Sequence, residues 1–252
     1  MSALNLASLP LDLRALRRWA AARGFAQDEG RALHHLLAET FGKGQLQPFR
    51  LMAAPGAAHA SLYAYARADA PGLLQVAREC ALPDALAACD VAQLATKTMP
   101  ESWKTGRRLA FDLRVRPTRR LHKPAGSLPK GAEVDAYLVE AMRRFPAGRP
   151  PLEERVAREE VYLRWLKERL QDAARVDAAR IVSFERRKAL RGATQREGPE
   201  VVWHGELTVL DGSVFSTRLA SGVGRHAAYG FGMLLLRPAG LEDGYVGRTA
   251  RP

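Results

Sequence analysis

The sequence is poor in cysteine and has no long apolar run, and both absences restrict its class. Two cysteines, Cys80 and Cys89, in 252 residues are too few for a disulfide framework, and they do not form the CxxC pair of a zinc knuckle. No run of about 18 apolar residues occurs. The first residues lack the positively charged segment and the long apolar segment of a signal peptide. We therefore expect a soluble, cytoplasmic protein without a membrane partner.

The chain has fewer acidic than basic residues. The chain has 27 acidic residues against 39 lysines and arginines, which gives a formal net charge of +12. Its hydrophobic fraction of 47% is large enough for a buried core, so the chain is not a disordered polybasic protein. A folded domain this basic usually binds a polyanion, most often nucleic acid. From composition alone, a generally basic protein of a GC-rich genome is the alternative.

The basic residues are clustered, and this favours a nucleic-acid ligand over the compositional alternative. Residues 104–123 hold eight basic residues and a single acid, Asp112. Residues 186–196, RRKALRGATQR, hold no acid at all. Clusters of this kind create a local positive field that can follow a phosphate backbone.

The first hundred residues predict a strand, a helical segment, two paired strands, a helix and a strand. Asp12 and Asp28 are expected to cap two successive helices, which Gly24 and the GKG segment at 42–44 would end. The turn signal PGAA joins the two paired strands. This order is that of a ferredoxin-like fold. The expected strands are 3–9, 48–54, 60–67 and 90–98, and the expected helices are 11–23, 30–41 and 70–80.

The second half repeats this order after an insertion. In the strand at 108–116, leucine, phenylalanine and valine alternate with arginine, alanine and aspartate, so one face is expected in a core and the other is expected to offer arginines to solvent. Residues 118–152 are rich in proline, glycine and basic residues around a helical pattern at 133–145. The remaining expected elements are a helix at 152–171, strands at 179–186 and 200–210, a helix at 212–222 and a strand at 231–238.

The sequence therefore predicts an α+β protein of two tandem ferredoxin-like (RRM-like, βαββαβ) domains. The expected domains are residues 1–100 and residues 101–240, with a partly helical basic insertion at about 118–152 in the second. Residues 241–252 are expected to form a loose tail.

A glycine-rich segment, GVGRHAAYGFG at 222–232, precedes the last expected strand. Its start nominally fits the dinucleotide-binding pattern GxGxxG/A. That pattern must lie between a first strand and a helix, whereas here a strand-like run closed by a proline follows, so the cofactor interpretation is excluded. Glycines in such a loop allow its N–H groups to bind a phosphodiester. The alternative is that they only permit tight helix–strand packing.

The pattern G-x-G-x5-G-x-G before an apolar strand resembles the signature loop of the CRISPR repeat-processing endoribonucleases of the RAMP superfamily. The segments LAFDLRVRPTRRL, VYLRWLKERL and WHGELTVLDG also resemble segments of that family. The resemblance covers most of residues 101–238, and the CasE-like nucleases or their type IV counterparts are the most similar members.

The resemblance implies a function. It implies cleavage of precursor CRISPR RNA at the base of a repeat hairpin, without a metal or other cofactor, through attack by the substrate 2′-OH. The products would be a 5′-OH and a 2′,3′-cyclic phosphate, and the mature RNA would stay bound within a CRISPR ribonucleoprotein. A non-catalytic RNA-binding subunit of such a complex is the alternative, and a general double-stranded-RNA or tRNA-binding protein is a second one.

Candidate catalytic residues follow from the same resemblance. In CasE-like proteins a histidine in an LHxxL setting of an N-terminal helix carries catalysis, and His34 fits that position. Some members have a tyrosine three residues earlier, where this chain has Arg31. Arg31 and Arg23 are candidates to stabilise the charge of the phosphorane. The alternatives are an ordinary helix-face role for His34 and a helix-dipole role for Arg23.

Candidate RNA-binding residues lie in the arginine-rich strand, the insertion and the glycine-rich loop. Relatives often carry a lysine where this chain has Ala227, so Arg225 and His226 are expected to contact phosphate instead. Tyr229 is expected either to stack on a base or to pack within the protein. The full set is Arg114, Arg116, Arg119, Arg120, Lys123, Arg143, Arg144, Gly222, Gly224, Arg225, His226 and Tyr229.

Overall fold

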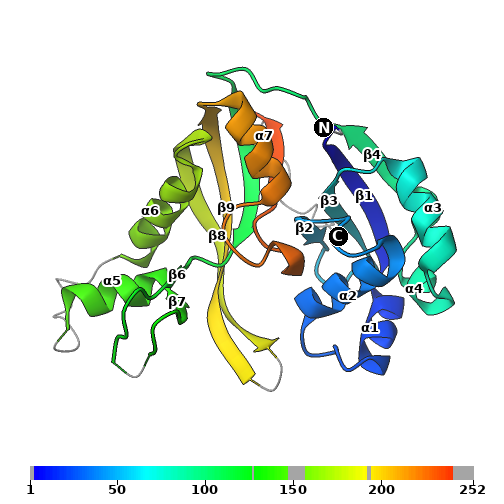
Figure 1. Ribbon diagram of the computed structural model, residues 1–252, viewed down its shortest axis with the longest axis horizontal. Helices are drawn as coiled ribbons and strands as arrows, with labels where there is room; N and C mark the ends of the chain where they lie inside the picture. The colour runs from blue at the N-terminus through cyan, green and yellow to red at the C-terminus, as the bar shows by residue number, and fades with distance from the viewer. Residues whose placement is uncertain (1–2, 127, 147–156, 192–193, 241–252) are drawn as a thin grey trace, which may run out of the picture.

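A four-stranded antiparallel sheet with helices packed on it forms each half of the molecule (Figure 1). The computed structural model describes residues 3–126, 128–146, 157–191 and 194–240, without the side chains of 188–196. The predicted helix start at 152–156 and the predicted tail at 241–252 lie outside the described residues. Among the described helices, none is long and apolar enough to cross a membrane.

The N-terminal half has the strand order β2-β3-β1-β4, which is that of a ferredoxin-like sheet. The helices cover one face of this sheet, and leucines and phenylalanines between the two layers are fully buried. The strands are β1 (Asn5–Asp12), β2 (Phe49–Met52), β3 (His59–Ala66) and β4 (Ala95–Thr98). The helices are α1 (Leu13–Ala22), α2 (Glu29–Phe41), α3 (Ala70–Cys80) and α4 (Pro83–Ala88), with a 3-10 turn η1 at Val91–Gln93.

Local sequence signals position the first two helices as predicted. The Asp12 carboxylate accepts hydrogen bonds from the N–H groups of Arg14 and Ala15, and the Asp28 carboxylate accepts one from the N–H of Arg31. These side chains satisfy N–H groups that have no partner within the helix. The strand predicted at 90–98 is shorter than expected, because η1 occupies its first residues and β4 begins at Ala95.

The C-terminal half repeats the topology, with strand order β10-β5-β9-β8. Helices α6 and α7 bury Trp165, Leu166 and Phe215 against the sheet. The elements are β5 (Arg108–Val115), α6 (Arg158–Leu170), β8 (Ala174–Arg191), β9 (Thr194–Val209), α7 (Gly212–Ser221), the 3-10 turn η3 (Ala227–Tyr229) and β10 (Leu234–Pro238). The fold class predicted from the sequence is confirmed.

The insertion is a small hairpin followed by a helix. Strand β6 (Thr118–Arg120) pairs with β7 (Glu133–Asp135), and α5 (Ala136–Arg144) follows at once. The helix predicted at 133–145 is thus a strand over its first three residues. The insertion is fixed to α6, because the indole N–H of Trp165 donates to the carbonyl of Thr118 and Arg158 pairs with Asp135.

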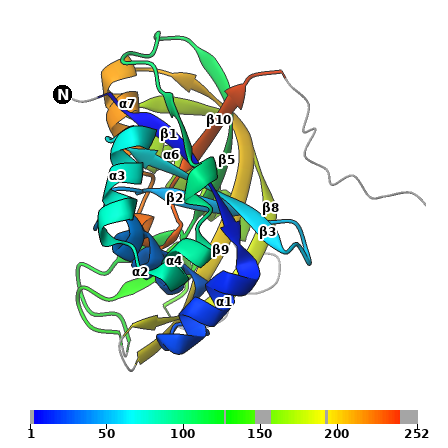
Figure 2. The ribbon, with the colours of Figure 1, turned by 90° about the vertical axis from the view of Figure 1, so that its right-hand side faces the viewer.

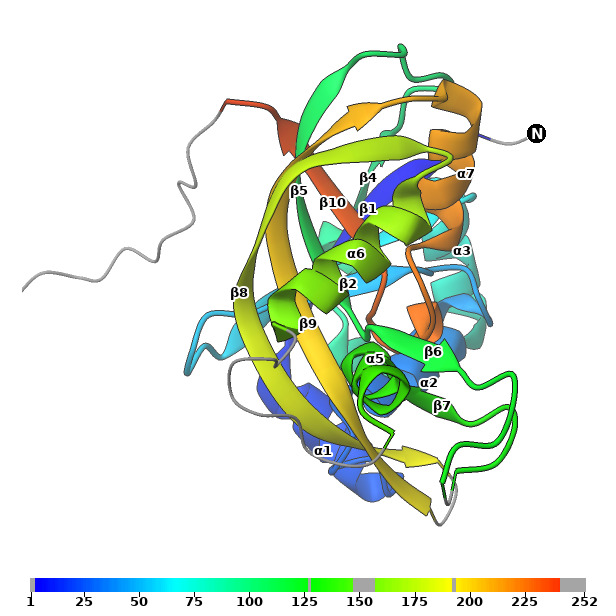
Figure 3. The same cartoon turned by 90° about the vertical axis from the view of Figure 1, so that its left-hand side faces the viewer.

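Strands β8 and β9 form a ribbon much longer than the sequence predicts. Their pairing runs from Ala174↔Val209 to Arg191↔Thr194, whereas β9 pairs with β5 only over Val201–Thr208. The part of the pairing from Glu185↔Glu200 to Arg191↔Thr194 is therefore a two-stranded ribbon that leaves the sheet (Figure 3). The described residues of the basic cluster at 186–196 lie at its end.

Arg114 and Arg116 of β5 are not exposed, so the prediction that they face solvent is wrong. The Arg114 side chain is 12% exposed, and Arg116 is buried. The reason is that β5 is an interior strand, and that Phe231 of the glycine-rich loop lies against both side chains while Glu200 pairs with Arg114. Arg50 of β2 lies 3.5 Å from the carboxylate of Asp112 on β5. Across the same junction, the Tyr65 hydroxyl donates to the carbonyl of Leu234.

Candidate functional site at the junction of the two domains

The glycine-rich loop at 222–232 fills the junction between the domains. It connects α7 to β10 in the C-terminal half and lies against α2 and β2 of the N-terminal half (Figure 2). The contact is very close at Gly30 of α2, where an added Cβ would lie 2.7 Å from the carbonyl oxygen of Tyr229. An added Cβ at Gly230 would lie 3.0 Å from the ring of Phe49. The loop therefore packs directly against the N-terminal domain.

The glycines of this loop are required by the protein itself. Gly224 has φ +82°, and an added Cβ would lie 2.9 Å from the Trp165 ring. Gly232 has φ +81°, and its added Cβ would lie 2.6 Å from the carbonyl oxygen of Val223. Positive φ and such close packing both exclude a side chain. These observations favour tight packing as the role of Gly222 and Gly224, and their phosphate-binding role stays a prediction.

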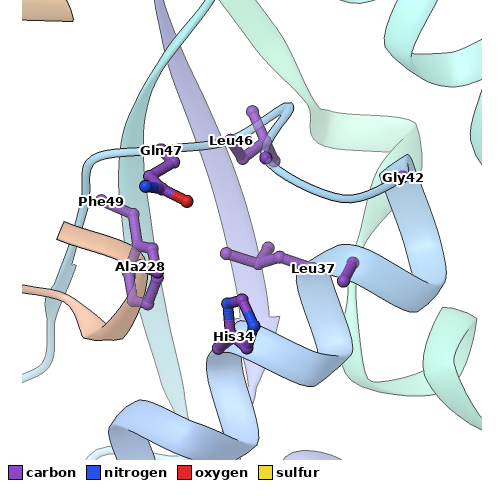
Figure 4. A pocket seen from close by; sticks show the side chains of 9 residues that line it. His34, Leu37, Gly42, Leu46, Gln47, Phe49 and Ala228 are labelled. Carbon is purple, nitrogen blue, oxygen red and sulfur yellow. The ribbon is translucent and has the colours of Figure 1, made fainter. Parts of the chain in front are cut away.

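His34 lies at this junction. It follows the buried Leu33 on α2, is itself half-buried, and lines a small recess with Leu37, Gln47 and Phe49 (Figure 4). Ala228 of the glycine-rich loop closes the recess from the other domain. The residues on α2 that face the core are Leu33, Leu36, Leu37 and Phe41, so His34 occupies the edge of the buried stripe.

Tyr229 brings a second polar ring to His34. The centroids of the two rings lie 5.1 Å apart with an interplanar angle of 43°. Tyr229 ends the turn η3, which is bounded by His226 at φ +69° and Gly230 at φ +82°. Its side chain is 38% exposed. An imidazole and a phenol from different domains therefore share one accessible surface.

The expected phosphate contacts of the loop are engaged with a carboxylate. Nε2 of His226 lies 2.6 Å from Oε1 of Glu133, and Nη1 of Arg225 lies 3.5 Å from Oε2 of the same residue. The Thr118 hydroxyl also donates to Glu133. The His226 side chain is buried, whereas Arg225 is exposed. Glu133 thus fixes the loop to the insertion, and sequence reasoning did not single it out.

Arg31 and His35 flank His34 on α2. The Arg31 guanidinium lies over the ring of Phe25, which stacks on His35 at 4.4 Å. Partial burial lowers the pKa of His35, and the nearby charges of His34 and Arg31 lower it further. Arg31 has no carboxylate partner within the part of the chain that the structure describes. Its guanidinium charge therefore lies one helical turn from His34, held by the ring of Phe25.

Arg23 has a different environment. Its guanidinium pairs with Asp84 of α4 at 2.7 Å and with Glu39 of α2 at 3.0 Å, and it lies over the ring of Trp19. The hydrogen bond from Arg23 lowers the pKa of Asp84. The structure thus places the Arg31 guanidinium beside Phe25, on the same helix as His34, and shows Arg23 joining three helices.

The cations of the insertion fall into two groups. Arg119 pairs with Glu168 of α6, and Arg144 pairs with Glu140 of its own helix. By contrast, Arg120, Lys123 and Arg143 are exposed and have no carboxylate partner among the described residues. The second group is the one available to an anionic ligand.

The two buried arginines of β5 support the loop and the ribbon. Arg114 pairs with Glu200 of β9 and lies over the ring of Phe231 at 4.6 Å. Arg116 donates to the carbonyl of Arg187 in the β8–β9 ribbon at 2.9 Å. Neither is placed to meet a ligand at the surface in this structure. Among the described residues, no cluster of three or more His, Cys, Asp or Glu could hold a metal ion.

Comparisons with known proteins identify one family by a family model, and several solved structures of similar fold. The family model described as CRISPR associated protein matches residues 6–238. A structure of CRISPR endoribonuclease Cse3 bound to a 19-nucleotide RNA is 20% identical, covers 94% of this chain and all of its own, and has a TM-score of 0.65. Thermus thermophilus Cse3, bound to an RNA representing a pre-cleavage complex, is 21% identical with the same coverage and a TM-score of 0.62.

A third similar structure is the CRISPR-associated protein Cas6e from Escherichia coli str. K-12. It is 19% identical, with 93% of this chain and 99% of that chain covered and a TM-score of 0.56. A search of curated proteins finds no match. At these identities the structural similarity shows a shared fold.

Proposed function

The chain belongs to the family of CRISPR associated proteins, and from that premise we propose that it is an endoribonuclease that cleaves precursor CRISPR RNA within its repeat, at the base of a stem-loop. The observation that carries the proposal is the meeting of His34 and Tyr229 at the domain junction, with Arg31 one helical turn from His34 on α2. The similarity in fold to endoribonucleases solved with RNA bound supports it, and so does the net charge of +12.

The proposed reaction is an internal transesterification of RNA. The 2′-oxygen of one nucleotide attacks the adjacent phosphorus and loses its proton, while the bond from phosphorus to the 5′-oxygen of the next nucleotide breaks and that oxygen gains a proton. The products are a 2′,3′-cyclic phosphate and a 5′-OH. The protein has to move two protons and neutralise the charge that develops on the phosphorane.

The residues at the junction match these tasks. Imidazole exchanges protons near neutral pH, so His34 is the residue for proton transfer. The Tyr229 hydroxyl hydrogen-bonds the scissile phosphate or its neighbouring ribose and holds it against His34. Arg31 is permanently charged and donates in a planar fork, which suits stabilisation of the phosphorane. Arg23 supports the helices instead, since two carboxylates already hold its guanidinium.

The RNA stem binds, in this proposal, between the insertion and the β8–β9 ribbon. Figures 1 and 3 place both in the same half of the molecule, below the middle of each view. Arg120, Lys123 and Arg143 are the available cations of the insertion, and the exposed Arg225 contacts phosphate beside the site. Such contacts bind A-form RNA largely through its backbone and shape. The cleaved RNA stays bound and joins the other subunits of a CRISPR ribonucleoprotein in the cytoplasm.

One experiment tests the proposal. The protein is mixed with a labelled hairpin repeat RNA in EDTA, and in parallel with a copy that carries a single 2′-deoxy nucleotide just upstream of the scissile bond. We expect cleavage of the first RNA and tight binding without cleavage of the second. Binding of both RNAs without cleavage would instead identify a non-catalytic RNA-binding subunit. Absence of RNA binding would overturn the proposal entirely.

A further inference from the structure

The outer face of α1 carries arginines that nothing in the proposed site uses. Arg14, Arg17 and Arg18 are exposed and lie at i, i+3 and i+4, which places them on one side of the helix. The other exposed residues of this helix are Ala21 and Ala22. The helix contains no acidic residue.

These three arginines have no ion-pair partner among the described residues, although the pKa of Asp12 is lowered by hydrogen bonds from the backbone of the helix start and, less strongly, by the nearby charge of Arg18. None of them forms an ion pair with a described residue, unlike Arg23, Arg108 or Arg119, each of which has a carboxylate within 3.0 Å. Asp12, the acid that precedes the helix, accepts hydrogen bonds from backbone N–H groups at the helix start. Like charges at i and i+4 repel, and a cation in the first turn opposes the helix dipole. The arrangement is unfavourable for the free helix, which points to an anionic ligand.

The side chains on the exposed side of α1 indicate which class of anionic ligand it can bind. Interfaces with proteins are anchored by apolar or aromatic side chains in desolvated pockets, and the exposed part of α1 offers only alanines besides its arginines. It also lacks an exposed aromatic ring on which a base would stack. Three guanidinium groups on such a surface suit the phosphates of a nucleic-acid backbone, independent of its sequence.

The position of α1 relates this face to the site. Arg23, at the end of α1, pairs with Glu39 of α2, and Phe25, just beyond it, stacks on His35. Helix α1 has ten residues and is about 15 Å long. Arg14, Arg17 and Arg18 therefore lie within about 15 Å, along the helix, of the contact between the end of α1 and α2. All three ribbon views place α1 at the end of the molecule where the β8–β9 ribbon ends (Figures 1 to 3).

We propose that the outer face of α1, formed by Arg14, Arg17 and Arg18, binds the phosphates of single-stranded RNA that flanks the hairpin. This inference rests on the proposed function for the identity of the RNA. The flanking strand leaves the junction at His34 and continues over the N-terminal domain, whereas the stem is held by the C-terminal domain. The face contributes affinity and positioning for the flank, and the hairpin alone does not use it.

Binding assays with three RNAs test this inference. They are the 2′-deoxy hairpin, the same hairpin with an unstructured 5′ extension of about eight nucleotides, and the hairpin with a matching 3′ extension. We expect the wild-type protein to bind at least one extended RNA roughly tenfold more tightly, with a log–log salt slope steeper by about 2. The variant Arg14→Gln/Arg17→Gln/Arg18→Gln should lose that advantage and bind the hairpin as before.

A matched control removes the same charge elsewhere. Arg78, Lys97 and Lys167 are exposed cations without a carboxylate partner among the described residues, and Arg78→Gln/Lys97→Gln/Lys167→Gln should keep the advantage. An equal advantage in the α1 variant, or none in the wild type, would overturn the inference. Because binding of uncleavable RNA is measured, failure of the α1 face is distinguished from failure of cleavage. Circular dichroism confirms that each variant is folded.

Discussion

The ring of Tyr229 lies 5.1 Å from the ring of His34, although the two residues belong to different domains. The contact exists because the glycine-rich loop of the C-terminal domain seats its backbone on Gly30, one turn before His34 on α2. The proposed site is therefore assembled by domain packing. Any change that separates the loop from α2 should affect cleavage before it affects the fold of either domain.

His34 and its neighbour His35 should respond differently to substitution. We expect His34→Ala to slow single-turnover cleavage by about 100- to 10,000-fold, the usual contribution of general acid–base catalysis, with little change in RNA affinity. His35→Ala is the matched control. It removes a stacking partner of Phe25 on the exposed side of α2, and should keep most of the activity. Equal losses in both variants would show that α2, not His34, is what the reaction needs.

The hydroxyl of Tyr229 is separable from its ring. We expect Tyr229→Phe to slow the cleavage step roughly tenfold, as for loss of one hydrogen bond of about 1.4 kcal/mol, while RNA affinity is unchanged. Tyr229→Ala should lose more, because the ring against His34 is also removed. Tyr137→Phe, in the insertion, is the control. Wild-type kinetics in Tyr229→Phe would limit Tyr229 to packing or base stacking.

The substitution Gly30→Ala has two opposing effects, a gain in helix propensity and a steric clash with the glycine-rich loop. Alanine within a helix is favoured over glycine by about 0.5–1 kcal/mol. Its Cβ, however, would lie 2.7 Å from the Tyr229 carbonyl oxygen and push the loop away from α2. We therefore expect folded protein with cleavage reduced toward that of Tyr229→Ala, measured in single-turnover assays.

Gly72→Ala in α3 is the matched control for Gly30→Ala. An added Cβ at Gly72 would meet only side-chain atoms, the closest at 3.2 Å, and this variant should cleave as the wild type does. Full activity together with a higher melting temperature in Gly30→Ala would contradict the role given to this contact.

Much of the fold could be predicted from the sequence because its signals are local. Asp12 and Asp28 cap helices where they are expected to, and the order of elements reproduces both sheets. Alternation along β5 correctly separates its two faces, but it carries no information about what covers the second face. The sequence therefore predicts Arg114 in solvent, whereas its side chain pairs with Glu200.

The site could be predicted only in part, since its contacts join segments far apart in the chain. The resemblance to a family selects His34 on α2. No periodicity or spacing connects that residue to Tyr229, or His226 to Glu133 of the insertion. The length of the β8–β9 ribbon was also missed, because its end reads as a basic cluster without alternation.

The buried pair Arg50–Asp112 should stabilise the junction of the domains. Both side chains are about one-tenth exposed, with 11% for Arg50 and 12% for Asp112, and Asp112 also contacts Nε2 of His204 at 2.9 Å. We expect Arg50→Met to lower the free energy of unfolding by roughly 3 kcal/mol, because it leaves a buried carboxylate with less compensation. Arg50→Met/Asp112→Asn should recover part of that loss. A double-mutant cycle by urea denaturation measures the coupling, and additivity within about 0.5 kcal/mol would contradict it.

Arg23 should matter for stability and not for cleavage. Its hydrogen bond lowers the pKa of Asp84 below the ordinary value of 3.8, so the unfolded chain binds a proton on Asp84 more readily than the folded protein does. The stabilisation is therefore fully present above that ordinary value and is lost as the pH falls through the lower pKa of the folded state. Arg23→Gln should accordingly be less stable than the wild type at pH 7, and the difference in urea midpoint should narrow below about pH 4.

The Arg23→Gln variant should cleave hairpin RNA at neutral pH as the wild type does, since Asp84 and Glu39 already hold the guanidinium of Arg23 away from a catalytic role. A cleavage defect as large as that of His34→Ala, in protein of normal stability, would show that Arg23 has the catalytic role predicted from the sequence.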